Sequence, residues 1–171
     1  MIENNNIIYF VKKQNNDNLW LLFAESKSEL KNRNLIRTSN IVGERGEQLV
    51  INFYSKTPNL PKLQAAPEST QNIDAISIKG DRYSIKTIST PGKTTGVFYG
   101  LNKNSSKEQD IPKFEYLIVV LLDKKLQPTK ILEATWEIFY RFKGWHSRMN
   151  AWNISITKDF EKNCKTIFQK D

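Results

Sequence analysis

The segment Phe114–Leu122 reads FEYLIVVLL and is apolar at every position except Glu115. A run this short and this continuous predicts a strand that is buried on both faces of a sheet. Such a strand requires other elements packed above and below it. Together with an order of helix, hairpin, strand and helix along the chain, it predicts the α/β class, with helices packed on a mixed sheet.

Hydrophobic periodicity, capping residues and turn residues predict the elements around this strand. Their expected order is a helix over 42–55, strands over 73–78 and 82–88, a long loop over 91–109, the strand over 114–122, a strand over 130–133, a helix after Thr135, a strand over 153–156, and a terminal helix that begins at Thr157 and carries Phe160, Ile167 and Phe168.

The N-terminal part contains two apolar runs, residues 6–13 and 18–24, separated by turn-forming residues. They predict either a hairpin or a second run that leads into a helix. Ser26 and Glu29 fit a capping box, which predicts a polar helix that ends near Asn34.

The chain of 171 residues contains one cysteine, Cys164, and one histidine, His146. These counts exclude an intrachain disulfide, a cysteine-based zinc site and a multi-histidine metal site. No apolar run approaches the ~20 residues of a membrane span. The first residues also lack the basic region and long apolar stretch of a signal peptide. We therefore expect a single cytoplasmic domain over 1–171 with no membrane partner.

The formal net charge is +8, from 26 Lys and Arg against 18 Asp and Glu. The basic surplus is spread along the chain and is largest after residue 120, where ten basic residues face six acidic ones. A spread surplus is typical of a solubilising surface, and it is also typical of a polyanion partner, most often nucleic acid. Charge alone leaves both interpretations open.

A carboxylate and a lysine lie on the two strands of the expected hairpin, Asp74 at the start of the first and Lys86 on the second. If these strands pair, the two side chains can meet, and Glu47 on the preceding helix can complete a site for a divalent metal. Magnesium binds oxygen ligands and keeps several waters, so two carboxylates and a phosphate oxygen suffice. A lysine beside the metal can position or deprotonate an attacking water and neutralise charge at phosphorus.

These residues resemble the PD-(D/E)XK nuclease superfamily, which includes restriction endonucleases and archaeal Holliday-junction resolvases. Gly43 and Glu47 look like its Gly-x-x-x-Glu helix start, and Asp74 looks like its central aspartate. The triplet Ser84-Ile85-Lys86 occupies the place of the (D/E)-x-K motif. The phrases VGERGEQLV and NIDAISIKGDRYSIK are similar to a restriction-associated branch that carries a Val-Gly-x-x-x-Glu helix and a Tyr-x-(Val/Ile)-Lys strand.

The resemblance covers roughly residues 30–122. It implies a restriction-endonuclease-like fold, that is, a mixed central sheet flanked by helices, with the core over about 41–122 and an N-terminal extension over 1–40 that contacts DNA. It also implies a Mg²⁺-dependent endonuclease of restriction or defence type, which hydrolyses phosphodiester bonds in double-stranded DNA. Because one such site cuts one strand, the resemblance favours a homodimer.

Ser84 departs from the family pattern, because serine cannot supply the charged metal ligand expected at this position. Some branches tolerate Ser or Gln there and recover the carboxylate from the helix. Glu47 is the first candidate for that role and Glu44 the second. Without a rescuing acid, the resemblance implies a nuclease-like binding domain.

The resemblance assigns metal binding to Asp74, Glu47 and Glu44, and assistance of the attacking water to Lys86. Ser84 is expected to hold a water or Lys86. Two other functions stay open, namely a catalytically inactive DNA-binding or assembly subunit, and a nuclease that acts on RNA or branched DNA. Each residue also has a plainer interpretation: Asp74 as a strand-end cap, Glu47 as a solvated helix residue and Lys86 as a strand-edge lysine.

The residues expected to contact DNA can donate hydrogen bonds to phosphates. They lie in the basic segment before the first core helix and in a loop over 91–107. They are Arg33, Arg37, Thr38, Ser39, Asn40, Lys93, Thr94 and Thr95.

The alternation of side chains along a strand makes one further prediction about the hairpin. A two-residue turn at Gly80-Asp81 places Lys86 on the face opposite Asp74. An odd-residue connection or a bulge, such as a three-residue loop that pairs Lys79 with Tyr83, brings both onto one face. The catalytic assignment therefore requires an odd connection.

Overall fold

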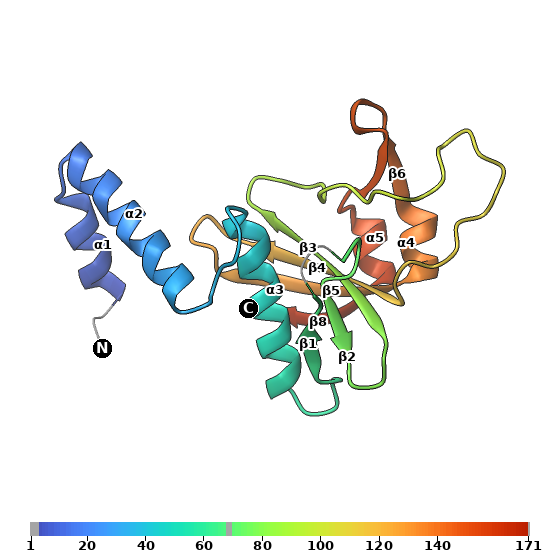
Figure 1. Cartoon of the computed structure of the whole chain (residues 1–171), viewed down its shortest axis with the longest axis horizontal. Helices are drawn as coiled ribbons and strands as arrows, with labels where there is room; N and C mark the ends of the chain where they lie inside the picture. Colours follow the sequence, from blue (N-terminus) through green and yellow to red (C-terminus); the bar gives the residue numbers. More distant parts are fainter. Residues whose placement is uncertain (1–3, 68–69, 171) are drawn as a thin grey trace. The chain divides into compact units, whose positions relative to one another are not determined.

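The computed structural model describes residues 4–67 and 70–170. The chain divides into two compact units, Met1–Ser39 and Asn40–Asp171 (Figure 1). Among the helices described, none is both long enough and apolar enough to cross a bilayer.

The first unit contains two helices, α1 (Asn4–Lys12) and α2 (Asn16–Asn32). Both apolar runs are therefore helical, and the interpretation as a strand hairpin is wrong. Asn15 begins α2, because its side chain accepts a hydrogen bond from the Asn18 amide at 2.9 Å. The capping box expected at Ser26 lies inside α2, so a helix is present there but begins ten residues earlier.

The second unit contains the remaining elements. They are α3 (Ile41–Lys56), β1 (Leu63–Ala65), β2 (Ala75–Ser77), β3 (Arg82–Ser89), β4 (Tyr116–Leu122), β5 (Pro128–Thr135), α4 (Trp136–Phe142), β6 (Lys143–His146), a 3₁₀ turn over Ser147–Met149, β7 (Ala151–Ile154), α5 (Lys158–Asn163) and β8 (Lys165–Gln169).

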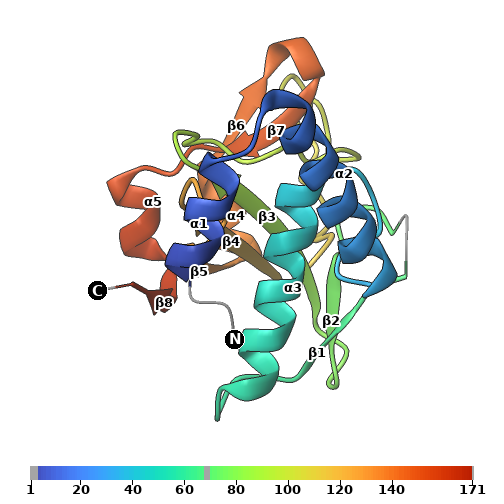
Figure 2. The ribbon, with the colours of Figure 1, turned by 90° about the vertical axis from the view of Figure 1, so that its left-hand side faces the viewer.

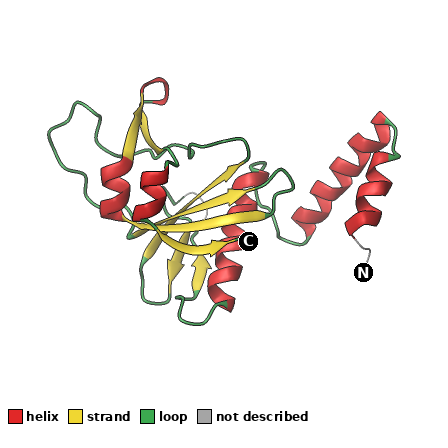
Figure 3. Ribbon diagram, turned by 180° about the vertical axis from the view of Figure 1, so that it is seen from behind, coloured by secondary structure: helices red, strands yellow, loops and turns green. Residues whose placement is uncertain are grey.

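Six strands form one sheet in the order β1-β2-β3-β4-β5-β8, and β6 and β7 form a separate ribbon (Figure 3). The strands β3 and β4 are parallel, whereas the other neighbouring pairs are antiparallel. Helices flank this mixed sheet (Figure 2). The expected α/β class and mixed central sheet are therefore confirmed.

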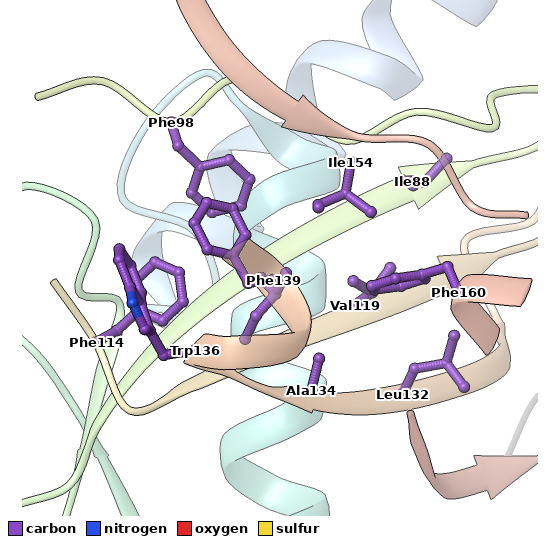
Figure 4. Packing of buried hydrophobic residues seen from close by; sticks show 11 residues of the cluster. Ile88, Phe98, Phe114, Val119, Leu132, Ala134, Trp136, Phe139, Ile154 and Phe160 are labelled. Carbon is purple, nitrogen blue, oxygen red and sulfur yellow. The ribbon is translucent and has the colours of Figure 1, made fainter. Parts of the chain in front are cut away.

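The strand β4 is buried on both faces, as its sequence predicts. Leu117 and Val119 belong to a core beneath α4 and α5 that contains Phe139 and Phe160 (Figure 4). The alternate residues of β4 belong to a second core on the other face of the sheet, under α3. Because successive side chains of a strand point to opposite faces of the sheet, β4 contributes residues to two separate hydrophobic cores.

The C-terminal end of the chain differs from the expected helix. Thr157 does cap α5 and accepts a hydrogen bond from the Phe160 amide at 3.1 Å. The helix then ends at Asn163, and the next residues form β8, which pairs antiparallel with β5. Phe168 packs on Phe53 of α3, with ring centroids 5.7 Å apart. This long-range contact and the pairing with β5 override the helical interpretation of the segment.

Residues 90–115 connect the parallel strands β3 and β4 without a helix or a regular strand. We call this segment the crossover. Backbone hydrogen bonds join it to β7, from Thr95 N to Ile154 O at 2.9 Å and from Phe98 N to Trp152 O at 2.7 Å. The ammonium of Lys143 also binds Asp110 at 2.6 Å, with both side chains at least 93% buried. The loop predicted here is therefore tied to the fold along its length.

Glu115 joins the starts of the two parallel strands. Its carboxylate accepts a hydrogen bond from the Arg82 amide at 2.6 Å and further bonds from the Arg82 guanidinium. The hydrogen bonds from the Arg82 side chain lower the pKa of Glu115 below its ordinary value. The charged form of Glu115 is thus favoured in the folded protein.

We predict that Glu115→Gln lowers the free energy of unfolding by about 1 kcal/mol at pH 7, because the pair is partly exposed and its charge-assisted bonds are screened. The pKa of Glu115 is lower in the folded protein than in the unfolded chain, where it is about 4.3. Its carboxylate therefore stabilises the fold at pH values above about 4.3, and this stabilisation is lost as the pH falls through the folded pKa. Urea unfolding of both proteins should therefore show a difference at pH 7 that shrinks below pH ~4. Glu108→Gln, at an exposed position of the crossover, is the control and should change little at either pH.

Candidate functional site

The β2–β3 hairpin has a three-residue loop. Ser77 N donates to Asp81 O at 2.9 Å, and residues 78–80 lie between them. Ala75 pairs with Tyr83 and Ile76 with Arg82. The predicted odd connection is therefore present, although Tyr83 pairs with Ala75 and not with Lys79.

This register decides the face on which each side chain of the site lies. Asp74 is the residue before Ala75 and Ser84 is the residue after Tyr83, so the same register sets Asp74 opposite Ser84. The two side chains are in contact, and Ser84 Oγ donates a hydrogen bond to Asp74 Oδ2 at 3.3 Å. Lys86 is two residues beyond Ser84 and so lies on the same face of β3. Asp74, Ser84 and Lys86 are thus brought to one face.

Asp74 stands at the point where β2 separates from β3. Its amide still donates to Tyr83 O at 2.8 Å, and its Oδ2 accepts from the Ile85 amide at 2.6 Å. A side-chain oxygen therefore takes the place of a strand carbonyl at the edge of β3. The carboxylate is half-buried and is held at the edge of β3 by the Ile85 amide and the Ser84 hydroxyl.

Ser84 is completely buried. Its hydroxyl donates a hydrogen bond to the carboxylate of Asp74, whereas the sequence led us to expect a water or Lys86 as its partner. Because serine is neutral, it can stand this close to Asp74 without the repulsion that a second carboxylate would cause.

Lys86 is half-buried, and its ammonium lies 5.0 Å from the ring centroid of Phe98, which is fully buried in the crossover. This distance is within the range of a cation–π contact, which holds a lysine without neutralising it. Sequence reasoning missed Phe98 because it lies in a segment expected to be a loop. The apolar pair Val97-Phe98 within that polar segment was the available signal.

Gly46 brings α3 close to β3. A Cβ atom at this position would lie 1.8 Å from Thr87 Oγ1, so only glycine permits the contact. The Thr87 hydroxyl oxygen is buried with no hydrogen-bond partner among the described residues. Thr87 is adjacent to Lys86 and points to the opposite face, so α3 covers the face of β3 away from Lys86.

Glu47 is placed by its neighbours on α3. Arg45 Nε donates to Leu126 O at 3.4 Å, which directs this flank of the helix toward the β4–β5 turn. At 3.6 residues per turn, Arg45 and Glu47 lie on opposite flanks of Gly46. Glu47 therefore lies on the flank toward β1, β2 and the edge of β3. Glu44 lies farther round the helix from the sheet and is only 8% exposed.

The described residues, 4–67 and 70–170, contain no group of three or more His, Cys, Asp or Glu side chains placed to hold a metal ion. The two candidate carboxylate ligands are Asp74, which bonds to the edge of β3, and Glu47 on α3. Carboxylate oxygens suit Mg²⁺, which commonly takes one or two protein carboxylates and fills its other positions with water and phosphate oxygens. The chemistry of this small donor set therefore fits Mg²⁺.

The residues expected to contact DNA fall in both units. Arg33 forms an exposed ion pair with Glu29 at 2.6 Å, and Arg37, Thr38 and Ser39 are exposed. Asn40 caps α3, because its side chain accepts from the Gly43 amide at 3.2 Å.

The three candidates of the crossover differ from one another. Lys93 and Thr94 are exposed. Thr95 is only 6% exposed, and its hydroxyl accepts a hydrogen bond from the Ile154 amide at 3.0 Å. The expectation for Thr95 is therefore corrected, because its hydroxyl is used to join the crossover to β7 and is not displayed to a ligand.

Comparison with known proteins gives no match for this chain, either among family models or among curated proteins. Inference about its function therefore depends on the geometry at the edge of β3 and on the resemblance of its residues to known motifs.

We predict that Asp74→Ala lowers the free energy of unfolding by about 2 kcal/mol, because it leaves the Ile85 amide without its acceptor. Asp74→Asn keeps a side-chain oxygen and should lose less than half as much. Urea denaturation of the three proteins measures both effects. Equal losses for the two variants would contradict the assignment of the stabilisation to the bond with Ile85.

Proposed function

We propose that this chain is a metal-dependent endonuclease of restriction or defence type, with a restriction-endonuclease-like fold, that hydrolyses phosphodiester bonds in double-stranded DNA. The observation that carries the proposal is the three-residue β2–β3 loop, which brings Asp74 and Lys86 to one face of the hairpin. A two-residue turn would have separated them.

The open edge of β3 supports the same proposal. The pairing of β2 with β3 ends before Ile85, whose amide bonds to the Asp74 side chain instead. The carboxylate of Asp74 and the ammonium of Lys86 therefore lie beside a part of β3 that β2 does not cover. Glu47 lies on the flank of α3 toward this edge. Asp74 and Lys86 can therefore both meet a phosphate group that approaches along the edge, and the proposal requires Glu47 to reach the same edge from the α3 side of the sheet.

In the proposed reaction, Asp74 and Glu47 would hold a Mg²⁺ ion, and Glu44 is the alternative acid on the helix. When bound, Mg²⁺ would lower the pKa of a coordinated water and withdraw charge from the phosphate. Lys86 places its ammonium beside the attacking water and the phosphate oxygens, where it stabilises the negative charge that develops at phosphorus. Phe98 fixes the direction of this lysine through its ring face.

A second function is favoured by the contacts of Asp74. Its Oδ2 is already bonded to the Ile85 amide and to the Ser84 hydroxyl, as a structural cap would be. With Ser84 in place of an acid, the same fold can bind DNA without cutting it. This alternative is a nuclease-like DNA-binding or assembly subunit, and a cleavage assay separates it from the enzyme.

We predict that Lys86→Met reduces Mg²⁺-dependent cleavage of plasmid DNA by at least about 100-fold, because the charge beside the phosphate is lost. Lys79→Met is the matched control, since Lys79 is exposed at the tip of the same hairpin, and it should cleave within about twofold of the parent. Gel assays on supercoiled plasmid measure both rates.

Three outcomes decide between the candidate functions. Cleavage that is unchanged in Lys86→Met removes the site from the mechanism. A parent protein that binds duplex DNA but does not cut it with Mg²⁺ supports the inactive subunit. Faster cleavage of RNA or of a four-way junction than of duplex DNA assigns the activity to those substrates.

We also predict that binding of duplex DNA weakens steeply with salt, because a chain of net charge +8 releases counterions when it contacts phosphates. For six phosphate contacts the affinity should fall by about 10³-fold between 50 and 200 mM salt. Fluorescence anisotropy with labelled duplex measures this slope, and Lys86→Met should bind nearly as well as the parent. An affinity that does not change with salt would argue against any nucleic-acid partner.

A further inference from the structure

The α1–α2 hairpin displays a large apolar surface. No described residue from 5 to 35 is buried, and nine large apolar side chains of this unit are 38–73% exposed. They occupy residues 7–11 of α1 and 19–23 of α2, and the largest exposed fraction belongs to Trp20. A helix pair that buries nothing of its own has little to stabilise it in water.

The apolar residues occupy consecutive positions and so extend around each helix. Five successive residues in α1 and six in α2, 19–24, cover more than one full turn each. A helix that lies on a membrane surface needs a polar face opposite its apolar face, and these segments have none. Helices that are apolar on all sides are typical of a packed protein interior.

The area exposed is sufficient for a stable interface between proteins. Aromatic side chains each carry roughly 150–250 Å² of surface, so the four aromatic residues of the hairpin, 52–73% exposed, present on the order of 500 Å², and the five exposed aliphatic residues add to this area. Stable interfaces bury about 800 Å² on each partner. Tyr9, Phe10, Trp20 and Phe23 also belong to the aromatic type that dominates binding energy at interfaces.

The described residues of the second unit, 40–67 and 70–170, offer no apolar surface of matching size. Among the described residues of the second unit, four large apolar side chains are strongly exposed, namely Ile78, Tyr99, Ile111 and Met149. They come from the β2–β3 loop, the crossover and the 3₁₀ turn, and both faces of the sheet already carry helices. The apolar surface on this molecule that can complement the hairpin is therefore the hairpin itself.

We infer that the α1–α2 hairpin is a dimerisation module, and that its partner is the same hairpin of a second copy of this chain. Two identical hairpins related by a twofold axis form a four-helix bundle whose core is built from the inward-facing members of residues 7–11 and 19–24. The charged second half of α2, from Glu25 to Asn32, stays in solvent. This inference does not depend on the proposed endonuclease activity.

The test measures the mass of the full chain in solution. Interfaces of this size have Kd values in the micromolar range or lower. At about 50 μM chain, sedimentation equilibrium should therefore give twice the chain mass of 19.9 kDa. Phe10→Asp combined with Trp20→Asp should raise the dimer Kd by at least about 100-fold, as expected when two hot-spot residues are lost. Ile78→Asp combined with Ile111→Asp is the control, since both residues are at least 73% exposed in the second unit, and it should remain dimeric.

Near-ultraviolet circular dichroism of the variants reports whether the second unit keeps its packing. If the double aspartate variant has lost it, Trp20→Ala alone must raise the Kd by at least tenfold. A parent that sediments as a monomer overturns the inference, as does a dimer that both hairpin variants leave intact. A monomer that binds vesicles of phosphatidylcholine and phosphatidylglycerol through the hairpin also overturns it and assigns the surface to lipid.

Discussion

The parallel pairing of β3 with β4, two strands of a sheet covered on both faces, is the constraint on which the rest of the second unit depends. Because parallel neighbours cannot be joined by a tight turn, the chain must cross one face of the sheet between Ser89 and Tyr116. That crossing carries Phe98 into the core and above Lys86. The buried pair of Asp110 and Lys143 then holds the crossing segment in place. The surroundings of the candidate site thus follow from the topology of two strands.

The same carboxylate serves the sheet and the candidate site. Asp74 closes the pairing of β2 with β3 by accepting a hydrogen bond from the Ile85 amide, and it is also the carboxylate at the centre of the candidate site. Its neutral partner, Ser84, is buried against it. A second acid at that position would add charge for a metal but would also place two negative groups at one buried site. The serine present here therefore bonds to Asp74 without adding a second negative charge at this buried position.

Local patterns predicted the parts of the fold that short-range physics decides. The run at 114–122 and the apolar stripe of α3 each depend on a few adjacent residues, and each is present. The odd connection of the hairpin was inferred instead from the requirement that Asp74 and Lys86 share a face, and it is also present. The strand β8 could not be predicted, since Ile167 and Phe168 fit a helix equally well until β5 and Phe53 are in place. In the site, spacing aligned Asp74 with Lys86, whereas the contact with Phe98 depends on the path of a distant loop.

The length of the crossover also has a consequence for the order of folding. Strands β1, β2 and β3 pair as close neighbours in sequence, and so do β4 and β5. Joining β3 to β4 instead closes a loop over residues 90–115, at an entropic cost of about 3 kcal/mol. Such long-range pairing is the slow part of folding in small domains. We therefore expect the two pairings that close long loops, β3 with β4 across residues 90–115 and β5 with β8 across residues 136–164, to form more slowly than the local pairings.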